Sequence, residues 1–373
     1  QKKKEGWLER AGEFHWLPVW KIVSMQNGVT YRDYRSDFGE TEIRSGKAAL
    51  KISDLCADHE LRIGLYGEII YSELEQDSSK HEDWNITSSL SLCYKKIDFQ
   101  PSYWYTQEEH VTAVTLSATD ILIFNRIGLW AGVTKKYAVL SLPFTIRLAL
   151  MQGLNLVLCN EPALEVSSYL NEIDANHYAR TEGHLLHPLK PVDVKAALEI
   201  NTAIPFTVYY RVQAVLDRRT YYYQEHDFYR IVPAHVVIQS PGIELSWHQG
   251  SFHIKNSFNL HDYRIYEKKG TYSFSQLDME MPYESGLENI TRLELDVGPA
   301  RIESALIYLS SRKDETGSDL DEVFRIDLTI SLQILENVKF TAGIDNILAR
   351  EMTYFPGYPE DVRMLRGGFQ IRF

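Results

Sequence analysis

Apolar and polar residues alternate one by one along many stretches of this chain, most clearly near its C-terminal end. Over residues 338–346 (VKFTAGIDN) and 364–373 (MLRGGFQIRF), every second position falls on a mostly apolar face, and the positions between them form a more polar face. A period of two residues predicts β-strands with one apolar and one polar face. We therefore expect the chain to end in a two-faced strand, the last residue of which is the aromatic Phe373.

The same alternation recurs upstream and predicts a sheet of many strands. Further strands are predicted over residues 61–71, 192–201, 206–217, 243–247, 252–261 and 324–333. The stretch between residues 110 and 150 is compatible with either one strand or two.

The connections between these strands are predicted to alternate between short and long. Short turns are expected near residues 95–97, 202–205, 248–250, 297–300 and 335–337. Long polar loops are expected near residues 72–83, 158–190, 265–288, 311–322 and 347–363. Tight turns at one edge and long loops at the other are typical of a transmembrane β-barrel, whereas a β-sandwich does not sort its loops in this way.

We therefore predict an all-β fold, an antiparallel transmembrane β-barrel of about 16–18 strands with short periplasmic turns and long external loops. The barrel is expected to span residues 27–373, and residues 1–26 form an N-terminal lead-in of unclear structure because they show no clean period. No run of about 18 apolar residues occurs, so a helical membrane span is not expected. The alternative is a soluble β-sandwich in which the apolar faces form the core.

Composition changes this picture in three places. The net charge of -12 argues against a nucleic-acid partner, which requires a basic face. The 23 tyrosines, with 7 tryptophans and 15 phenylalanines, suit the aromatic girdles of a barrel at the membrane–water interface. The three cysteines, Cys56, Cys93 and Cys159, lack metal-binding spacing and are expected to be unreactive.

If the apolar face meets lipid, the charged side chains point into a water-filled lumen, because a charge facing lipid at mid-bilayer costs about 2–4 kcal/mol. Six charged residues are then the candidates for contact with a passing solute: Arg211, Lys255, Arg325, Asp327, Lys339 and Asp345.

No catalytic constellation is visible, so we expect neither an enzyme nor a bound cofactor or metal. His253 and His261 share a polar face but are eight residues apart, about 26 Å along a strand, and cannot share a metal ion. The acidic side chains between residues 314 and 322 are interpreted as a solvated external loop rather than as a calcium site.

The C-terminal segment resembles the end of the barrel in TonB-dependent outer-membrane receptors. A strand ends in an Asn-Leu-type turn, a loop carries a Tyr and a Gly-Tyr-Pro, and an Arg opens the closing strand. The residues that carry this resemblance, and that it implicates in closing the barrel, are Asp345, Asn346, Tyr354, Gly357, Tyr358, Pro359, Arg363, Phe369, Ile371 and Phe373. The segments 187–191 and 238–247 resemble a Leu-Lys-Pro strand entry and a strand of the same family.

The resemblance implies a location in the bacterial outer membrane and a role in the uptake or passage of a solute. Receptors of this family carry a plug domain before a 22-stranded barrel, and this chain is too short for both. We expect a shortened plugless barrel, a fragment of a longer receptor, or one half of a split barrel, and in none of these cases does energised uptake carry over.

Two further functions stay open at this point. The chain could be a structural barrel subunit that docks partner proteins through its external loops, or a soluble all-β binding module. The partners expected for a barrel are the lipid bilayer together with other outer-membrane or surface proteins, or a chain that supplies a plug.

Overall fold

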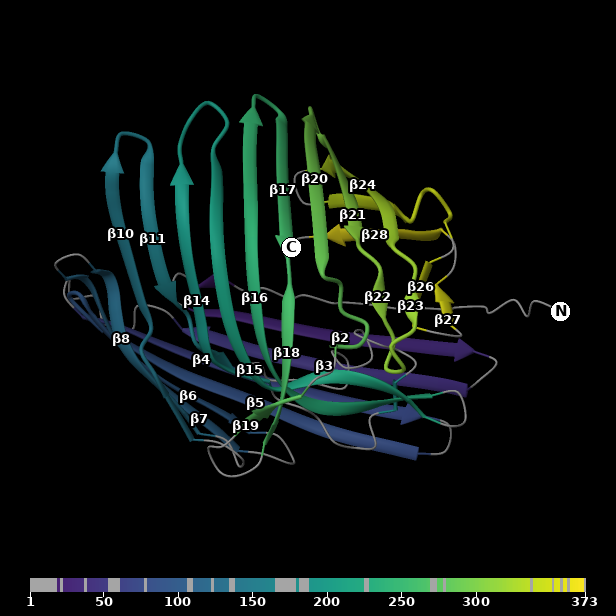
Figure 1. The fold of residues 1–373 in the computed structure, drawn as a ribbon, viewed down its shortest axis with the longest axis horizontal. Coiled ribbons are helices and arrows are strands. Elements are labelled where there is room, and N and C mark those ends of the chain that lie inside the picture. Colours follow the sequence, from purple (N-terminus) through teal and green to yellow (C-terminus); the bar gives the residue numbers. More distant parts are fainter. Residues whose placement is uncertain are drawn as a thin grey trace. The chain divides into compact units, whose positions relative to one another are not determined.

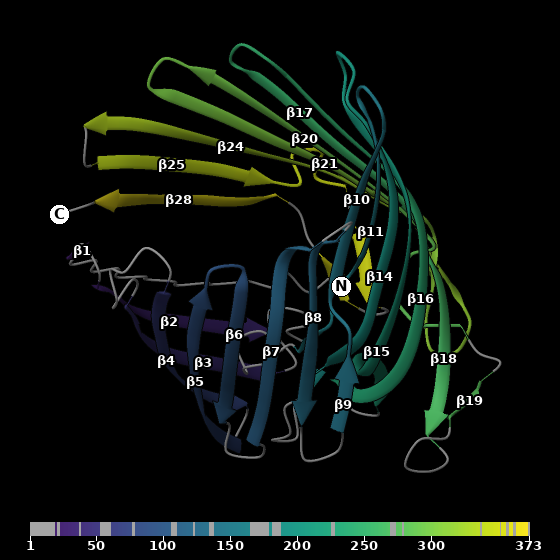
Figure 2. The same cartoon turned by 90° about the vertical axis from the view of Figure 1, so that its left-hand side faces the viewer.

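The computed structural model is built from β-strands (Figures 1 and 2). It describes residues 19–20, 23–36, 39–52, 61–76, 79–105, 110–121, 124–133, 138–164, 179–180, 188–224, 228–268, 274–277, 280–335, 338–350, 352–355, 358–360 and 363–371. Most of the lead-in predicted over residues 1–26 lies outside this part of the chain, and strand β2 already begins at Val23.

The strands of the first part of the chain range from 2 to 16 residues in length. They are β1 (Val19–Trp20), β2 (Val23–Ser36), β3 (Gly39–Ile52), β4 (Leu61–Gln76), β5 (Ser79–Tyr94), β6 (Ile97–Tyr105), β7 (His110–Ile121), β8 (Phe124–Val133), β9 (Ala138–Ser141), β10 (Phe144–Met151), β11 (Leu154–Asn160), β12 (Ala163–Leu164) and β13 (Ala179–Arg180). The stretch between residues 110 and 150, which the sequence left open between one strand and two, contains β7, β8, β9 and most of β10.

The second part continues the same pattern. Its strands are β14 (Leu189–Ile200), β15 (Phe206–Gln224), β16 (Phe228–Gln249), β17 (Phe252–Leu260), β18 (Asp262–Lys268), β19 (Phe274–Gln276), β20 (Leu287–Val297), β21 (Ala300–Leu309), β22 (Arg312–Lys313), β23 (Asp319–Leu320), β24 (Val323–Leu335), β25 (Val338–Asp345), β26 (Met352–Phe355), β27 (Tyr358–Glu360) and β28 (Met364–Ile371).

Most of these strands belong to one large sheet. At three places in the sheet, two consecutive short strands share one neighbouring strand and together make one crossing. Strands β9 and β10 both pair with β8, β11 and β12 both pair with β14, and β17 and β18 both pair with β16. The crossings of the sheet by the described residues are therefore β2 to β8, β9 with β10, β11 with β12, β14 to β16, β17 with β18, β20, β21, β24, β25 and β28. These eighteen crossings confirm the predicted antiparallel all-β fold of about 16–18 strands.

The chain divides into two compact units. The first contains residues 1–145, 160–192 and 215–234, and the second contains residues 146–159, 193–214 and 235–373. In the first unit Trp130 and Leu189 are buried against Ala113, and in the second Tyr209 is buried against Ala197. Among the described residues no helix is long and apolar enough to cross a membrane.

The tight turns follow the sequence, and their sharpness has a backbone cause. Gly250 and Gly298 both adopt a φ of 58°, a left-handed conformation that costs glycine little. The hairpins β16–β17 and β20–β21 turn at these residues, within the turns predicted near residues 248–250 and 297–300.

The long loop predicted over residues 72–83 is wrong. Strands β4 and β5 continue through this segment in unbroken register from Ser72↔Asp83 to Gln76↔Ser79. Backbone pairing does not require apolar side chains, and Lys80 Nζ lies 3.3 Å from Glu73 and 2.9 Å from Glu82, so opposite charges stabilise the polar end of this hairpin. The segments predicted as long loops over residues 311–322 and 347–363 contain the short hairpins β22–β23 and β26–β27.

The sheet of the second unit has two chemically distinct faces. Register partners place Lys255, Arg292, Ala305 and Asp327 on one side, which we call the charged face. The opposite side, which we call the apolar face, carries large side chains that stay exposed, including Ile330 (42%), Leu332 (37%) and Leu365 (76%). The soluble β-sandwich alternative is therefore wrong, because it requires these side chains to be sealed between two sheets.

Candidate functional site

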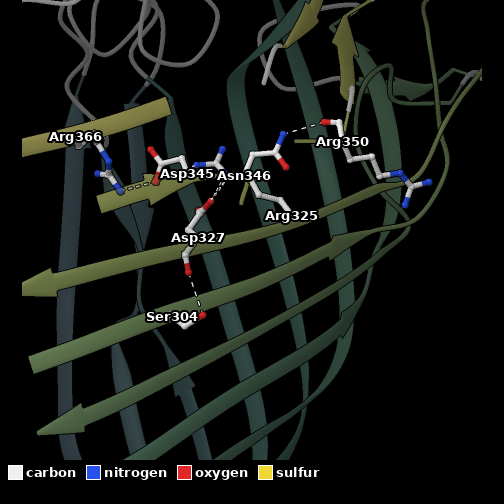
Figure 3. Close-up of polar contacts among 7 residues, drawn as sticks. All are labelled: Ser304, Arg325, Asp327, Asp345, Asn346, Arg350 and Arg366. Atoms are coloured by element: carbon white, nitrogen blue, oxygen red, sulfur yellow. Dashed lines mark hydrogen bonds and ion pairs between the residues drawn. The ribbon is translucent and has the colours of Figure 1, made fainter. Parts of the chain in front are cut away.

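A polar network joins the last three strands of the sheet on the charged face (Figure 3). Arg366 Nη2 of β28 donates to Asp345 Oδ1 of β25 at 2.6 Å, and Arg325 Nη2 of β24 lies 3.8 Å from the same oxygen. Arg325 Nε also donates to Asp327 Oδ1 at 2.7 Å. Asp345 is buried, with 6% of its side chain exposed, so its charge is compensated by two guanidinium groups rather than by water.

Asn346 connects this network to the turn that follows β25. Its backbone N–H donates to Asp327 Oδ1 at 2.9 Å, and its side-chain Nδ2 donates to the carbonyl of Arg350 at 2.8 Å. Asn346 has a φ of 51° and is 2% exposed. Asparagine tolerates the left-handed region better than most residues, which explains why an asparagine follows Asp345 at this turn.

The residues of the C-terminal family motif are thus partly brought together. Arg363 Nε donates to the carbonyl of Ile347 at 2.9 Å, so it holds the start of β28 against the turn after β25. Strand β26 contains Tyr354, and β27, which pairs with it, contains Tyr358 and Pro359.

Strand β28, which carries the last motif residues, is held to β25 by backbone pairing. Phe369 and Ile371 face Phe340 and Val338 in the β25–β28 register. Gly357 and Phe373 lie outside the described residues.

Arg211 belongs to a second network, on β14 and β15. Its Nε and Nη2 atoms both lie 2.6 Å from the carboxylate of Asp193, and Gln213 Nε2 donates to the same carboxylate at 3.0 Å. This fork-to-fork geometry is the strongest form of an arginine–carboxylate pair. Asp193 is buried, so the pair is shielded from the screening that weakens surface pairs.

Tyr209 extends this second network across the sheet. Its hydroxyl donates to Asn259 Oδ1, and Lys195 Nζ lies 4.0 Å above its ring. A Cβ atom at Gly242 would lie 2.6 Å from the Tyr209 ring, so only glycine leaves room for it. This close packing explains why a glycine occupies position 242, in the interior of strand β16.

The other two predicted lumen residues stand apart from both networks. Lys339 on β25 faces Gln333 on one side and Gln370 on the other. Lys255 on β17 faces Ser246 and Arg292. Of the six predicted charged residues, Arg325, Asp327 and Asp345 thus form one cluster, and Arg211, Lys255 and Lys339 lie elsewhere on the charged face.

Several charged partners were missed by sequence reasoning. Glu294 accepts from Arg301 at 2.6 Å and lies 3.5 Å from His253 Nδ1, which joins three strands in the same manner as Asp345 does. Asp193 and Arg366 were visible as polar positions of alternating strands. Their pairing depends on strand register, and the sequence does not state the register of neighbouring strands.

In the acidic loop after β21, the carboxylate of Asp314 accepts hydrogen bonds from the loop itself. Asp314 Oδ1 accepts from the Thr316 hydroxyl at 2.6 Å and from the backbone N–H groups of Thr316 and Ser318. Burial of Asp314 by itself would raise its pKa, but these hydrogen bonds outweigh burial and hold the pKa below its ordinary value. Among the described residues no group of three metal-ligating side chains occurs.

The cysteines contribute no cross-link to the described part of the chain. Cys93 and Cys159 are free thiols, and Cys56 lies outside the described residues.

The fold is similar to that of several outer-membrane transporters and receptors of known structure. The chain matches the siderophore receptor PirA from Acinetobacter baumannii with a TM-score of 0.59 at 8% identity, over 96% of this chain and 76% of that one. It matches the iron transporter FrpB from Neisseria meningitidis with a TM-score of 0.57 at 11% identity, over 96% and 78%.

A third similar structure is the outer membrane transporter YddB from Escherichia coli, with a TM-score of 0.54 at 10% identity over 95% of this chain and 66% of that one. No protein-family model matches the chain. No curated protein matches it by sequence either. The likeness therefore concerns the fold.

Proposed function

We propose that this chain is an integral β-barrel protein of the bacterial outer membrane that passes or receives a solute. In this proposal the apolar face meets lipid, the charged face lines a water-filled lumen, and residues 27–373 form the barrel. The lipid bilayer is then its first partner. A plug supplied by another chain, or another surface protein, is a further proposed partner.

The exposure of large apolar side chains on one face of a single sheet carries the proposal. Ile330 and Leu332 on β24 are 42% and 37% exposed, and Leu365 on β28 is 76% exposed. Water-soluble proteins rarely expose contiguous apolar patches of this kind, whereas lipid-facing strands require them. The charged networks on the opposite face would be costly in lipid and are stable beside water.

A solute path is supported by the same charged face. Arg211, Lys255, Arg325, Asp327, Lys339 and Asp345 remain the proposed lumen residues, and in this role they would set selectivity by charge. The similarity in fold to transporters named for iron, copper and siderophores supports transport as the class of function, without naming this chain's substrate.

Two measurements test the proposal. Fractionation of cells that express the full chain should recover it in the outer membrane, resistant to extraction with alkaline carbonate. A folded, monomeric protein in the aqueous fraction would overturn the membrane assignment.

Reconstitution in liposomes then separates transport from docking. A barrel that passes solutes should support swelling of the liposomes or ion conductance, whereas a docking subunit that is sealed should support neither. Protein that is folded in the liposomes but impermeable would overturn the transport part of the proposal.

A further inference from the structure

Two cations face each other directly on the charged face of the second unit. Lys255 of β17 and Arg292 of β20 are register partners, and both are exposed. Directly opposed residues on one face of an antiparallel pair have Cβ atoms about 4.5–5.5 Å apart, and like charges at such positions destabilise the sheet. A negative charge nearby would compensate this repulsion.

No described residue supplies that compensation. Neither Lys255 nor Arg292 makes an ion pair or a side-chain hydrogen bond with any residue in the described part of the chain. The chain has a net charge of -12, so carboxylates are abundant, yet no carboxylate that the structure describes pairs with Lys255 or Arg292.

The nearby carboxylates are each held by another cation. Glu244 lies 3.1 Å from Lys195, and Glu199 lies 3.0 Å from Arg147. Glu294, two residues beyond Arg292 on the same strand, accepts from Arg301 at 2.6 Å. The positive charge of the Lys255–Arg292 pair is thus left over after its neighbours have been paired.

The pair lines a hollow in the second unit. The hollow has a volume of about 530 Å³, and its lining includes Glu199, Glu244, Ser246, Lys255, Ser257 and Arg292. Ser246 is the register partner of Lys255 on its other side, and Ala305 is the partner of Arg292. The Ser246 hydroxyl lies 3.1 Å from His253 Nε2 and is engaged there, so the two cations are the charged donors of this hollow that face an incoming anion. The small side chain of Ala305 leaves space beside the guanidinium group.

We infer that Lys255 and Arg292 form a binding site for a small oxyanion, a carboxylate or a phosphate group of a solute. A guanidinium group offers two parallel N–H donors that match such a group, and an ammonium group adds a compact charge beside it. This inference rests on the proposed function, because it assigns an anionic substrate class to the solute that enters the lumen.

The test uses the full chain in detergent micelles, where binding is measured without any requirement for conductance. The thermal unfolding midpoint is followed during titration with sodium succinate and, separately, with inorganic phosphate, at an ionic strength held constant with sodium chloride. The wild-type protein should show a saturable rise in the midpoint with at least one of the two anions. The anion that binds more tightly identifies the carboxylate or the phosphate as the preferred group.

The variants Lys255→Gln and Arg292→Gln should each weaken binding by about tenfold or more, because each removes one charged donor. Lys313→Gln is the matched control, since Lys313 is a cation of the same unit, with 41% of its side chain exposed, that lies 3.2 Å from Glu280 and does not line the hollow. It should bind the anion as the wild type does. Without anion, both site variants should melt no lower than the wild type, because each removes a repulsion between like charges.

The inference is overturned if the wild-type protein shows no saturable response to either anion, or if the two site variants respond as the wild type does. A protein that conducts in liposomes yet binds neither anion would remove this site and leave the proposed function standing. Anion binding by a protein that does not conduct would support the site and overturn transport.

Discussion

The backbone N–H of Asn346 donates a hydrogen bond of 2.9 Å to the carboxylate of Asp327, across the boundary between β24 and the turn after β25. This contact places Asp327 between the turn and Arg325, whose Nε lies 2.7 Å away. The last described strand, β28, is then attached to the same cluster through Arg366 and Asp345. The end of the sheet is therefore held by side chains as well as by backbone pairing.

Replacement of Asp345 by alanine should destabilise the protein by about 2–3 kcal/mol, because it removes the buried acceptor of this cluster and leaves guanidinium groups without it. Replacement of Arg366 should cost less than replacement of Asp345, because Arg325 still lies 3.8 Å from the carboxylate and 56% of the Arg366 side chain is exposed. Urea unfolding in lipid vesicles measures both values. Equal losses for the two variants would contradict the asymmetric burial of the pair.

In the turn after β25, alanine and glycine at position 346 should differ in their effect on stability. Asn346→Ala should destabilise the protein more than Asn346→Gly by about 1 kcal/mol, because alanine meets the steric cost of a φ of 51° and glycine does not. Both variants lose the hydrogen bond to the carbonyl of Arg350, so their difference isolates the backbone effect. The comparison uses the same urea unfolding experiment, and a more stable alanine variant would disprove the explanation.

The Asp193–Arg211 pair should show a larger coupling energy than the Lys195–Glu244 pair on the same face. The first pair is bidentate with a buried carboxylate, and the second joins side chains that are 27% and 48% exposed. A double-mutant cycle to alanine should give about 1–3 kcal/mol for the first pair and less than about 1 kcal/mol for the second. Coupling energies in the reverse order would contradict the difference in burial and geometry.

Neighbouring positions on β24 test the assignment of the two faces. Ile330→Lys places a charge on the apolar face and should cost about 2–4 kcal/mol if that position lies near the middle of a bilayer. Thr329→Lys is the matched control, because Thr329 lies on the charged face opposite Glu303 and the new cation gains an acidic neighbour. Folding yields in vesicles distinguish the two variants, and equal tolerance of both would contradict a lipid-facing apolar side.

The Asp314 loop predicts a response to acid. Its folded-state pKa is lower than the ordinary value of 3.8, so ionised Asp314 stabilises the loop fully above the unfolded pKa, and this contribution is lost as the pH falls through the folded pKa. Amide exchange at Thr316 and Ser318 should therefore be slower in the wild type than in Asp314→Asn at about pH 6. The difference should shrink as the pH falls through the folded-state pKa, where the wild-type carboxyl becomes protonated. A difference that persists unchanged there would show that the charge does not matter.

Much of the fold was predictable from alternation because a strand with one lipid-facing or core-facing side imposes a period of two on its own residues. The strands predicted over residues 252–261 and 324–333 correspond to β17 and β24. The loop predicted over residues 72–83 failed because backbone pairing continues through polar residues when charged side chains pair across the strands. Polarity by itself therefore does not mark the end of a strand in this chain.

The candidate site was predictable as a set of charged positions, and its arrangement was not. The sequence placed Asp345 and Lys255 on polar faces, but it did not reveal which charges surround each of them. In the structure two arginines compensate Asp345, whereas Lys255 faces another cation. That difference follows from which strands are neighbours and in which register, and register partners such as Lys255 and Arg292 are 37 positions apart in the chain.

The order of apolar and polar side chains by itself determined that this protein is a sheet with two unlike faces, because each strand carries that information locally. Tertiary structure decided which charges cancel and which remain. Ion pairs act over a few ångströms, and only the pairing of strands distant in sequence brings Arg366 to Asp345 and Arg292 to Lys255.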